Sequence, residues 1–424
     1  MADLESYRLS TLDNGLRVVT ERLPGVRSLS LGVWIDSGSR GEPGGVSGIS
    51  HFIEHLLFKG TQSYSAFDIA RIFDEMGAEP NASTSKEHTL VHARFLADNL
   101  EAAYGVIADM VVRPTLADID SEREVVLEEV AMYEDSPPEL IHDYLTASVF
   151  YAHPLGNPVI GHTETLRDID AAAVQSYHHA HYVNGSMVIA AAGNVDHELL
   201  CELTQQHFGG GDGAPPQVAL WAPEPRHVAA FSEKDTEQYH VCLGGPGPRH
   251  GDPDRYAVFL LDTLLGGAWS SRLFQEVRDK RGLAYSVYSY TTLYADTGLS
   301  AVYFGSREEA VGEAMTLILN ELRGVVAQVP EEDLERARHH LKGALVLSME
   351  SPSSRMQSLG RCILTGQPVL SLDEMLAAIE AVTLEDVAAA AAHYYDVEKW
   401  SAVCIGPRPE PFRAVAGDFT WEAS

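Results

Sequence analysis

The chain has 424 residues and a formal net charge of −31 at pH 7, because 30 Lys and Arg residues stand against 61 Asp and Glu residues. At about 150 residues per domain this length predicts two or three domains, and the 45% of hydrophobic residues is typical of a folded protein rather than a disordered one. The acidic excess argues against binding to nucleic acid or to an anionic membrane, since both attract clustered Lys and Arg.

Hydrophobic periodicity and turn residues predict strands and helices in mixed order. In the first half we expect strands at residues 16–20, 28–35, 90–95 and 187–192, and helices at 46–58, 66–76, 99–112 and 119–149. In the second half we expect strands at 239–243, 286–293, 300–304 and 401–405, and helices at 253–265, 271–280, 307–325, 331–349, 354–364 and 384–393. This order predicts the α+β class, with one antiparallel-rich sheet packed with helices in each half.

Gly and Pro residues cluster between positions 209 and 226, where they would break a helix or a strand. We therefore predict a first domain at residues 1–212, a linker at 213–226 and a second domain at 227–424. A strand, a turn and an apolar helix recur in both halves at an offset of 210 residues. A repeat of this length indicates a duplicated domain.

The amino-terminal residues are acidic and lack the features of a secretory signal or a transit peptide. No apolar run approaches the ~20 residues of a membrane helix. The four cysteines are widely separated and form no Cys-x-x-Cys pair, which is typical of reduced thiols. We therefore expect a cytoplasmic protein with no membrane association.

The most informative motif is the run HFIEH at residues 51–55, which lies in an amphipathic helix pattern. His51 and His55 are one helical turn apart, so their rings can converge on one metal ion. Glu54 lies beside them, where its carboxylate could accept a proton from water on the metal. The alternative interpretation is a solvated helix face that carries these residues by chance. A catalytic zinc site also requires a third protein ligand.

Candidates for the third ligand lie on the predicted helix at residues 119–149. Glu122 and Glu129 are seven positions apart, so they share one helix face, whereas Glu124 and Glu128 are rotated away from it. Acidic residues on a long helix usually form a solvated face. Their significance here therefore depends on the HFIEH run.

Together these residues resemble a known family. His51, Glu54 and His55, followed by Glu129 74 positions after His55, are similar to the inverted zinc motif of the M16 metallopeptidases. Similar runs occur at residues 58–61 (FKGT), 81–85 (NASTS), 153–156 (HPLG) and 266–278 (GGAWSSRLFQEVR). The resemblance covers nearly the whole chain and is strongest to the short bacterial members of the M16B type, which are similar to the β-subunit of the mitochondrial processing peptidase. It implies two domains of the LuxS/MPP-like metallohydrolase type.

The resemblance also implies roles for particular residues. His51, His55 and Glu129 would bind one Zn²⁺ per chain, and Glu54 would be the general base. Glu122 would hydrogen-bond to a ligand histidine and fix its orientation. Glu128 stays open as an alternative ligand, although helical phase relative to Glu122 favours Glu129.

The second half cannot bind the same metal, because at the offset of 210 the three motif residues correspond to Leu261, Leu264 and Leu265. The resemblance instead implies that Arg278 and Tyr285, spaced as Arg-x6-Tyr, contact the substrate carbonyl and stabilise the oxyanion. Without the family, Arg278 would be interpreted as a surface ion-pair residue and Tyr285 as an ordinary strand residue.

The resemblance further implies that the run at residues 81–85 belongs to a substrate-binding edge strand. An extended peptide could pair with such a strand through its backbone, which gives affinity with little sequence preference. The candidate residues for this contact are Asn81, Ala82 and Ser83.

These expectations combine into a zinc-dependent endopeptidase that hydrolyses unfolded peptides in a cleft between the two domains. The family implies a homodimer, and the acidic charge suggests a preference for basic peptides. Two alternatives remain. One is a zinc-bearing subunit similar to the processing-peptidase β-subunit, which needs a separate α-like partner. The other is a non-enzymatic scaffold similar to the core proteins of respiratory complexes.

Overall fold

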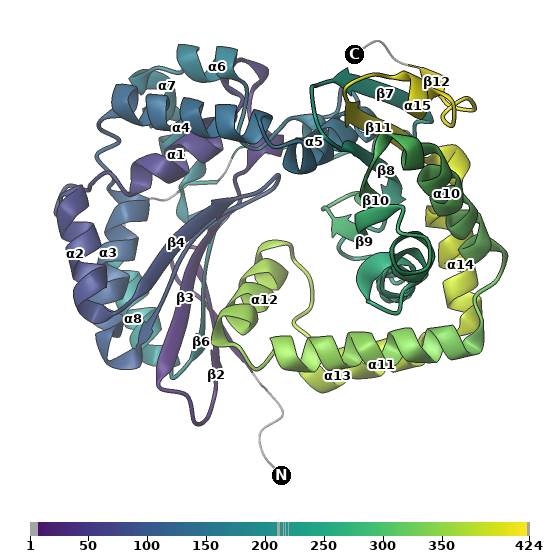
Figure 1. Ribbon diagram of the computed structural model, residues 1–424. Helices are drawn as coiled ribbons and strands as arrows, with labels where there is room; N and C mark the ends of the chain where they lie inside the picture. Colours follow the sequence, from purple (N-terminus) through teal and green to yellow (C-terminus); the bar gives the residue numbers. More distant parts are fainter. Residues whose placement is uncertain (1–6, 210–212, 215, 217, 219, 422–424) are drawn as a thin grey trace. The chain divides into compact units, whose positions relative to one another are not determined.

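The computed structural model describes residues 7–209, 213, 214, 216, 218 and 220–421. It divides into two compact units, each built around a six-stranded sheet (Figure 1). The described residues of the first unit lie within 1–131, 157–219 and 347–371, and those of the second lie within 132–156, 220–346 and 372–424. The units therefore differ from the predicted continuous domains, because each contains one segment from the opposite half of the chain. Part of the predicted linker lies outside the described residues.

The sheet of the first unit has the strand order β1-β2-β6-β3-β5-β4. Its strands are β1 (Arg8–Thr11), β2 (Arg17–Arg22), β3 (Ser28–Ile35), β4 (Glu79–Thr84), β5 (Thr89–Leu96) and β6 (Met187–Gly193). Only β2 and β6 pair in parallel, and the other neighbours are antiparallel. Strand β4 therefore forms one edge of the sheet.

The sheet of the second unit has the order β12-β7-β11-β8-β10-β9. Its strands are β7 (Val228–Glu233), β8 (Tyr239–Gly247), β9 (Ala284–Leu293), β10 (Gly298–Ser306), β11 (Ser401–Gly406) and β12 (Thr420–Trp421). Five strands occupy the same relative places as β2, β6, β3, β5 and β4 of the first sheet, and β7 and β11 again pair in parallel. The predicted α+β class, with an antiparallel-rich sheet in each unit, is confirmed.

Helices cover both faces of the first sheet. The main core lies between the sheet and helices of the first half, whose side chains interlock with those of β3, β5 and β6. These helices are α1 (Ile49–Leu57), α2 (Ala66–Met76), α3 (Leu100–Val112), α4 (Ile119–Glu134), α6 (Thr163–Asp168), α7 (Ala171–His181) and α8 (His197–His207). The opposite face is covered by α12 (Pro352–Leu364), which comes from the second half of the chain (Figure 1).

The second unit repeats this arrangement, and here the helix on the opposite face of the sheet comes from the first half of the chain. Its main core packs its sheet against helices of the second half. These helices are α9 (Arg255–Asp262), α10 (Val311–Ala327), α11 (Glu331–Ser348), α13 (Leu372–Ala381), α14 (Leu384–Tyr394) and α15 (Glu410–Arg413). The other face of the sheet is covered by α5 (Pro137–Val149), through Ile141 and Leu145. In the described part of the chain, no helix has both the length and the apolar character that a membrane crossing requires.

The single helix predicted at residues 119–149 is wrong. The structure has two helices there, α4 and α5, separated at Asp135 and Ser136. Pro137 and Pro138 follow this break, and proline cannot donate the backbone hydrogen bond that would continue α4. Proline is well tolerated in the first turn of a helix, so the same two residues begin α5.

Helix α12 packs closely against the first sheet, at places where two glycines permit it. A Cβ atom on Gly32 of β3 would lie 2.6 Å from the Met356 sulfur. A Cβ atom on Gly360 of α12 would lie 2.0 Å from the indole nitrogen of Trp34. Met356 is fully buried at this contact. The helix therefore forms part of the first unit's core although it comes from the other half of the chain.

We expect the substitution Met356→Ala to lower the free energy of unfolding by about 2–5 kcal/mol, because it leaves a cavity between α12 and the sheet. Leu347→Ala is the control, since Leu347 precedes α12 in the same unit but is 70% exposed, and its effect should stay below about 0.5 kcal/mol. Urea denaturation of both variants measures the difference. Equal effects of the two substitutions would show that α12 does not contribute to the core of the first unit.

Candidate metal centre

The start of α1 is fixed by a close backbone contact and a buried carboxylate. Gly48 has a positive φ of 93°, and a Cβ atom there would lie 2.8 Å from the Ile160 carbonyl oxygen. The Glu42 carboxylate accepts hydrogen bonds from the backbone N–H groups of Gly48 and Ser50, at 2.7 and 2.9 Å. Burial raises the pKa of Glu42 to about 7. These contacts set the position of the helix that carries the HFIEH run.

Packing then sets the rotation of α1. The apolar residues of the helix, Ile49, Phe52, Ile53, Leu56 and Leu57, are at most 1% exposed. The buried face therefore points into the core. His51, Glu54 and His55 lie on the remaining, partly exposed face.

Helix α4 presents the two predicted carboxylates to α1. Val126 and Val130 are buried in the core, and Glu122 and Glu129 lie on the same side of the helix. Glu122 is itself buried, whereas the Glu129 side chain is 46% exposed. The Arg123 guanidinium holds α4 in place by donating hydrogen bonds to two carbonyl oxygens ahead of α7.

The side chains of His51, His55 and Glu129 converge on one point. The His55 Nε2 atom lies 3.2 Å from the Glu129 Oε2 atom, and the His51 Nε2 atom lies 3.8 Å from the same oxygen. One ligand atom from each residue lies within 4.8 Å of the other two. Among the described residues this is the only group of three or more His, Cys, Asp or Glu side chains with such spacing. Glu129, and not Glu128, is the carboxylate in it.

The geometry and chemistry of this group fit zinc. Bonds of 2.0–2.1 Å in a tetrahedral site place neighbouring ligand atoms about 3.4 Å apart, close to the two measured separations. Two imidazole nitrogens and one carboxylate oxygen leave a fourth position open, as catalytic zinc sites do. Burial, and secondly the neighbouring His55, lower the pKa of His51 to about 4. The His51 ring is therefore neutral at pH 7, as a metal ligand must be.

Glu122 orients one of the two imidazoles. Its Oε1 atom lies 2.9 Å from His55 Nδ1, so the opposite ring nitrogen, Nε2, is turned towards Glu129. Its Oε2 atom pairs with Lys59 Nζ at 2.6 Å. Lys59 had no predicted role, although it lies in the FKGT run at residues 58–61. Together Glu122 and Lys59 hold the His55 ring in the orientation that ligation requires.

Glu54 is held by the end of the edge strand. The Thr84 hydroxyl, in the last residue of β4, donates a hydrogen bond of 2.5 Å to Glu54 Oε2. Burial raises the pKa of Glu54, and the hydrogen bond from Thr84 partly opposes that shift. Thr84 was not predicted as a site residue, although it belongs to the NASTS run at residues 81–85. A carboxyl group with a raised pKa is a stronger base once it is ionised.

Strand β4 has a free backbone edge beside Glu54. It pairs with β5 on one side, and no described strand pairs with it on the other. The side chains of Asn81 and Ser83 are exposed, while Ala82 packs partly against the core. The predicted edge strand is therefore present, with its last residue bonded to the candidate base.

Arg278 and Tyr285 lie together in the second unit. The Arg278 guanidinium carbon is 4.5 Å from the centre of the Tyr285 ring, and Tyr285 is 78% exposed. Their contact with a substrate carbonyl stays a prediction.

The second unit retains the polar surroundings of Glu54 but not the imidazoles. Thr84 pairs in register with Thr89 across β4 and β5, and Thr291 pairs with Ser300 across the equivalent strands β9 and β10. A buried tyrosine follows α7 in the first unit and α14 in the second, and each has a carboxyl group nearby. Tyr182 lies near Glu54, and Tyr395 lies near Asp262. Burial raises the pKa of Asp262 to about 6.

The leucines that the offset of 210 assigns to the motif, Leu261, Leu264 and Leu265, are all buried and offer no ligand atom. The contacts of Asp262 put that residue, two positions before Leu264, in the place of Glu54, so the correspondence predicted from the sequence is shifted by two residues. With this shift, Phe259 and Thr263 stand in the places of His51 and His55, and neither carries an imidazole. The second unit therefore cannot bind a metal in the same place.

Comparison with known sequences identifies the family. Residues 17–163 match the profile described as insulinase (peptidase family M16), and residues 168–341 match the M16 peptidase inactive domain. The chain belongs to the M16 peptidase family. The predicted resemblance is thereby confirmed at the level of the family. The match to an inactive domain agrees with the buried leucines of the second unit.

Individual M16 relatives match along almost the entire chain. A protein of Mycobacterium bovis named an uncharacterized zinc protease is 42% identical, and the match covers 97% of both chains. The zinc protease YmxG of Bacillus subtilis, also named uncharacterized, is 37% identical over 94% of this chain and 97% of its own.

Two solved structures share the fold. A Helicobacter pylori protease has a TM-score of 0.88 at 24% identity, covering 95% of this chain and 99% of that one. A structure from Pseudomonas fluorescens, titled as a peptidase M16 inactive domain, has a TM-score of 0.88 at 23% identity, with 95% and 98% coverage.

We expect Glu129→Gln to abolish stable metal binding, because a neutral amide is a poor zinc ligand. Glu128→Gln is the matched control, since it makes the same change one residue away on an exposed part of α4 and should leave the metal content unchanged. Zinc content after dialysis, measured by atomic emission, decides the point. Loss of zinc from the Glu128 variant instead would assign the ligand to Glu128.

Proposed function

We propose that the protein is a zinc-dependent endopeptidase that hydrolyses unfolded peptides bound as an extended strand along β4. One observation supports this most directly: the Glu54 carboxylate interacts electrostatically with His55 and Glu129 of the converging group and accepts a hydrogen bond from Thr84 of the edge strand. A peptide paired with β4 would thus pass close to both the base and the ligand group. The names of the relatives as zinc proteases support the same conclusion.

The residues of the first unit account for the steps of peptide hydrolysis. Bound zinc supplies Lewis-acid chemistry, which polarises a carbonyl group and makes water more acidic. Glu54 takes a proton from the attacking water and later delivers it to the leaving amine. Glu122 and Lys59 keep the His55 ring oriented throughout. We propose one zinc ion per chain.

Peptide binding along β4 would use backbone hydrogen bonds, which require an extended and therefore unfolded substrate. Asn81, Ala82 and Ser83 would line this contact. The net charge of −31 favours basic peptides. In the second unit, Tyr285 and Arg278 would donate hydrogen bonds to the oxyanion. We further propose the M16B type, a homodimer and a cytoplasmic location.

The substitution Glu54→Gln tests the mechanism directly. We expect the variant to retain about as much zinc as the natural chain, because Glu54 is not a ligand, and to lose cleavage of an unstructured basic peptide by roughly 10²–10⁴-fold. Quenched-fluorescence peptide assays and zinc analysis on the same samples give both readouts. Undiminished cleavage by this variant would exclude Glu54 as the base.

The hydrogen bond from Thr84 to Glu54 predicts a shift in pH dependence. Thr84→Val removes a donor that stabilises the carboxylate, so the pKa of Glu54 rises further. Because the base must be deprotonated, activity is lost as pH falls through that pKa, and the acidic limb of kcat/KM should move to higher pH by about 0.5–1 unit. The pH profile of cleavage measures this shift, with zinc content as the control for an intact site. A shift to lower pH would contradict the assignment.

A further inference from the structure

A continuous stack of side chains lies on the second unit. The rings of Trp269 and Phe274 are nearly parallel, at 4°, with their centres 6.4 Å apart. The Arg278 guanidinium lies over both Phe274 and Tyr285, at 4.7 and 4.5 Å from the ring centres. We call Trp269, Phe274, Arg278 and Tyr285 the aromatic stack. Contacts between a guanidinium and ring faces at this distance are attractive.

Arg278 is held by rings rather than by acidic groups. Its neighbours Lys280 and Arg281 both form ion pairs with Glu276. Arg272, at the start of the same segment, pairs with Asp333 at 3.3 Å. Within the described part of the chain, by contrast, the Arg278 side chain forms no ion pair and no hydrogen bond. Its donors thus stay available in a chain with a large excess of carboxylates.

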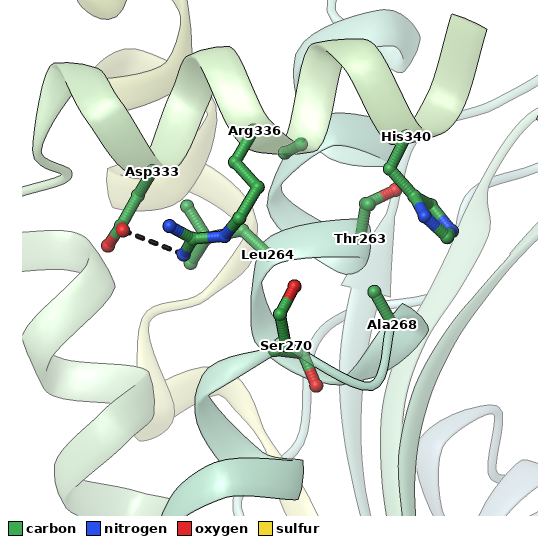
Figure 2. A pocket seen from close by; sticks show the side chains of 9 residues that line it. Thr263, Leu264, Ala268, Ser270, Asp333, Arg336 and His340 are labelled. Carbon is green, nitrogen blue, oxygen red and sulfur yellow. Dashed lines mark hydrogen bonds and ion pairs between the residues drawn. The ribbon is translucent and has the colours of Figure 1, made fainter. Parts of the chain in front are cut away.

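The backbone around the stack is firmly anchored. Phe274 and Arg278 belong to a short π-helical segment, Phe274–Asp279. The Gln275 side-chain amide donates a hydrogen bond of 3.0 Å to the Trp269 carbonyl oxygen. Beside Trp269, Ala268 and Ser270 face α11 across a small pocket, where Arg336 pairs with Asp333 (Figure 2). The backbone of this loop is therefore anchored by Gln275, while Trp269 is exposed to solvent.

The two ends of the stack are unusually exposed for aromatic residues. Trp269 is 84% exposed and Tyr285 is 78% exposed, whereas Phe274 between them is partly buried. An aromatic side chain offers a large contact area at a low cost in conformational entropy, because it has only two rotatable side-chain bonds. Rigid aromatic residues beside an unpaired guanidinium can contact a side chain and a carbonyl of the same peptide.

We propose that the aromatic stack is a specificity site, in which Trp269 binds an aromatic or large aliphatic side chain of an extended peptide and Phe274 positions Arg278 for the peptide backbone. This proposal rests on the proposed peptidase function and adds a preference within the substrate class. Phe274 is a positioning residue, since it acts through Arg278, and Trp269 is the contact residue.

The test uses two labelled, unstructured peptides of equal length and charge, one with several Phe and Leu residues and one with Ala at those positions. Binding is measured by fluorescence anisotropy on the full-length Glu54→Gln chain, so that it does not depend on cleavage. We expect tighter binding of the Phe/Leu peptide. Adding Trp269→Ala should weaken the binding of that peptide about tenfold and should change the binding of the Ala peptide little. Phe67→Ala is the control, because Phe67 is an exposed aromatic residue of α2 in the other unit.

Phe274→Leu tests the positioning role, because it retains apolar volume but removes the ring face. We expect kcat/KM of the otherwise natural chain to fall severalfold for both peptides, and Phe274→Tyr to restore it. Thermal unfolding checks that each variant folds. A defect of the leucine variant that tyrosine does not rescue would contradict the positioning role.

The outcomes separate this proposal from the proposed function. If the natural chain cleaves neither peptide although the Glu54 variant binds the Phe/Leu peptide through Trp269, the peptidase function fails and the specificity site stands. If cleavage occurs but Trp269→Ala weakens the binding of both peptides equally, or of neither, the proposal of a specificity site is wrong. Absence of any preference for the Phe/Leu peptide would also overturn it.

Discussion

The hydrogen bond between Glu122 and His55 connects the two helices on which the metal centre depends. Glu122 is buried on α4 and His55 is partly exposed on α1, and neither helix alone brings three ligand atoms together. Placing a carboxylate in the core costs free energy unless it is paired, and Glu122 has two partners, His55 and Lys59. The same contact orients the His55 ring and links α1 to α4, the helix that carries Glu129.

Much of this site could be predicted from the sequence, because helical periodicity is local. The four-residue spacing of His51 and His55, and the seven-residue spacing of Glu122 and Glu129, fix which side chains share a face before any tertiary contact is known. Thr84 and Lys59 were missed for the complementary reason. Their contacts to Glu54 and Glu122 span 30 and 63 positions of the chain and depend on how strand and helices pack.

The limits of prediction were similar for the fold. Individual helices and strands followed from periodicity, and the shared order of elements revealed the duplication. The error at residues 119–149 came from giving apolar spacing more weight than Pro137 and Pro138. The exchange of α5 and α12 between units could not be predicted, because an amphipathic helix pattern shows that a face is buried but not against which sheet. The second unit has the hydroxyl groups and the buried tyrosine around Asp262 but no metal-ligating histidines, so it shares the polar surroundings of the site without its ligands.

The exchange of α5 and α12 has a consequence for how the chain is made. During synthesis, the strands of the first sheet are complete once Gly193 has emerged, yet the helix that covers their outer face begins only at Pro352. Until then Trp34, Leu90 and Val188, all nearly fully buried in the finished protein, lack their partner on that face. An uncovered apolar sheet face is prone to aggregation in a nascent chain. The first unit therefore reaches its final packing only late in translation, and the two halves of the gene are expected to be poorly separable as independent folding units.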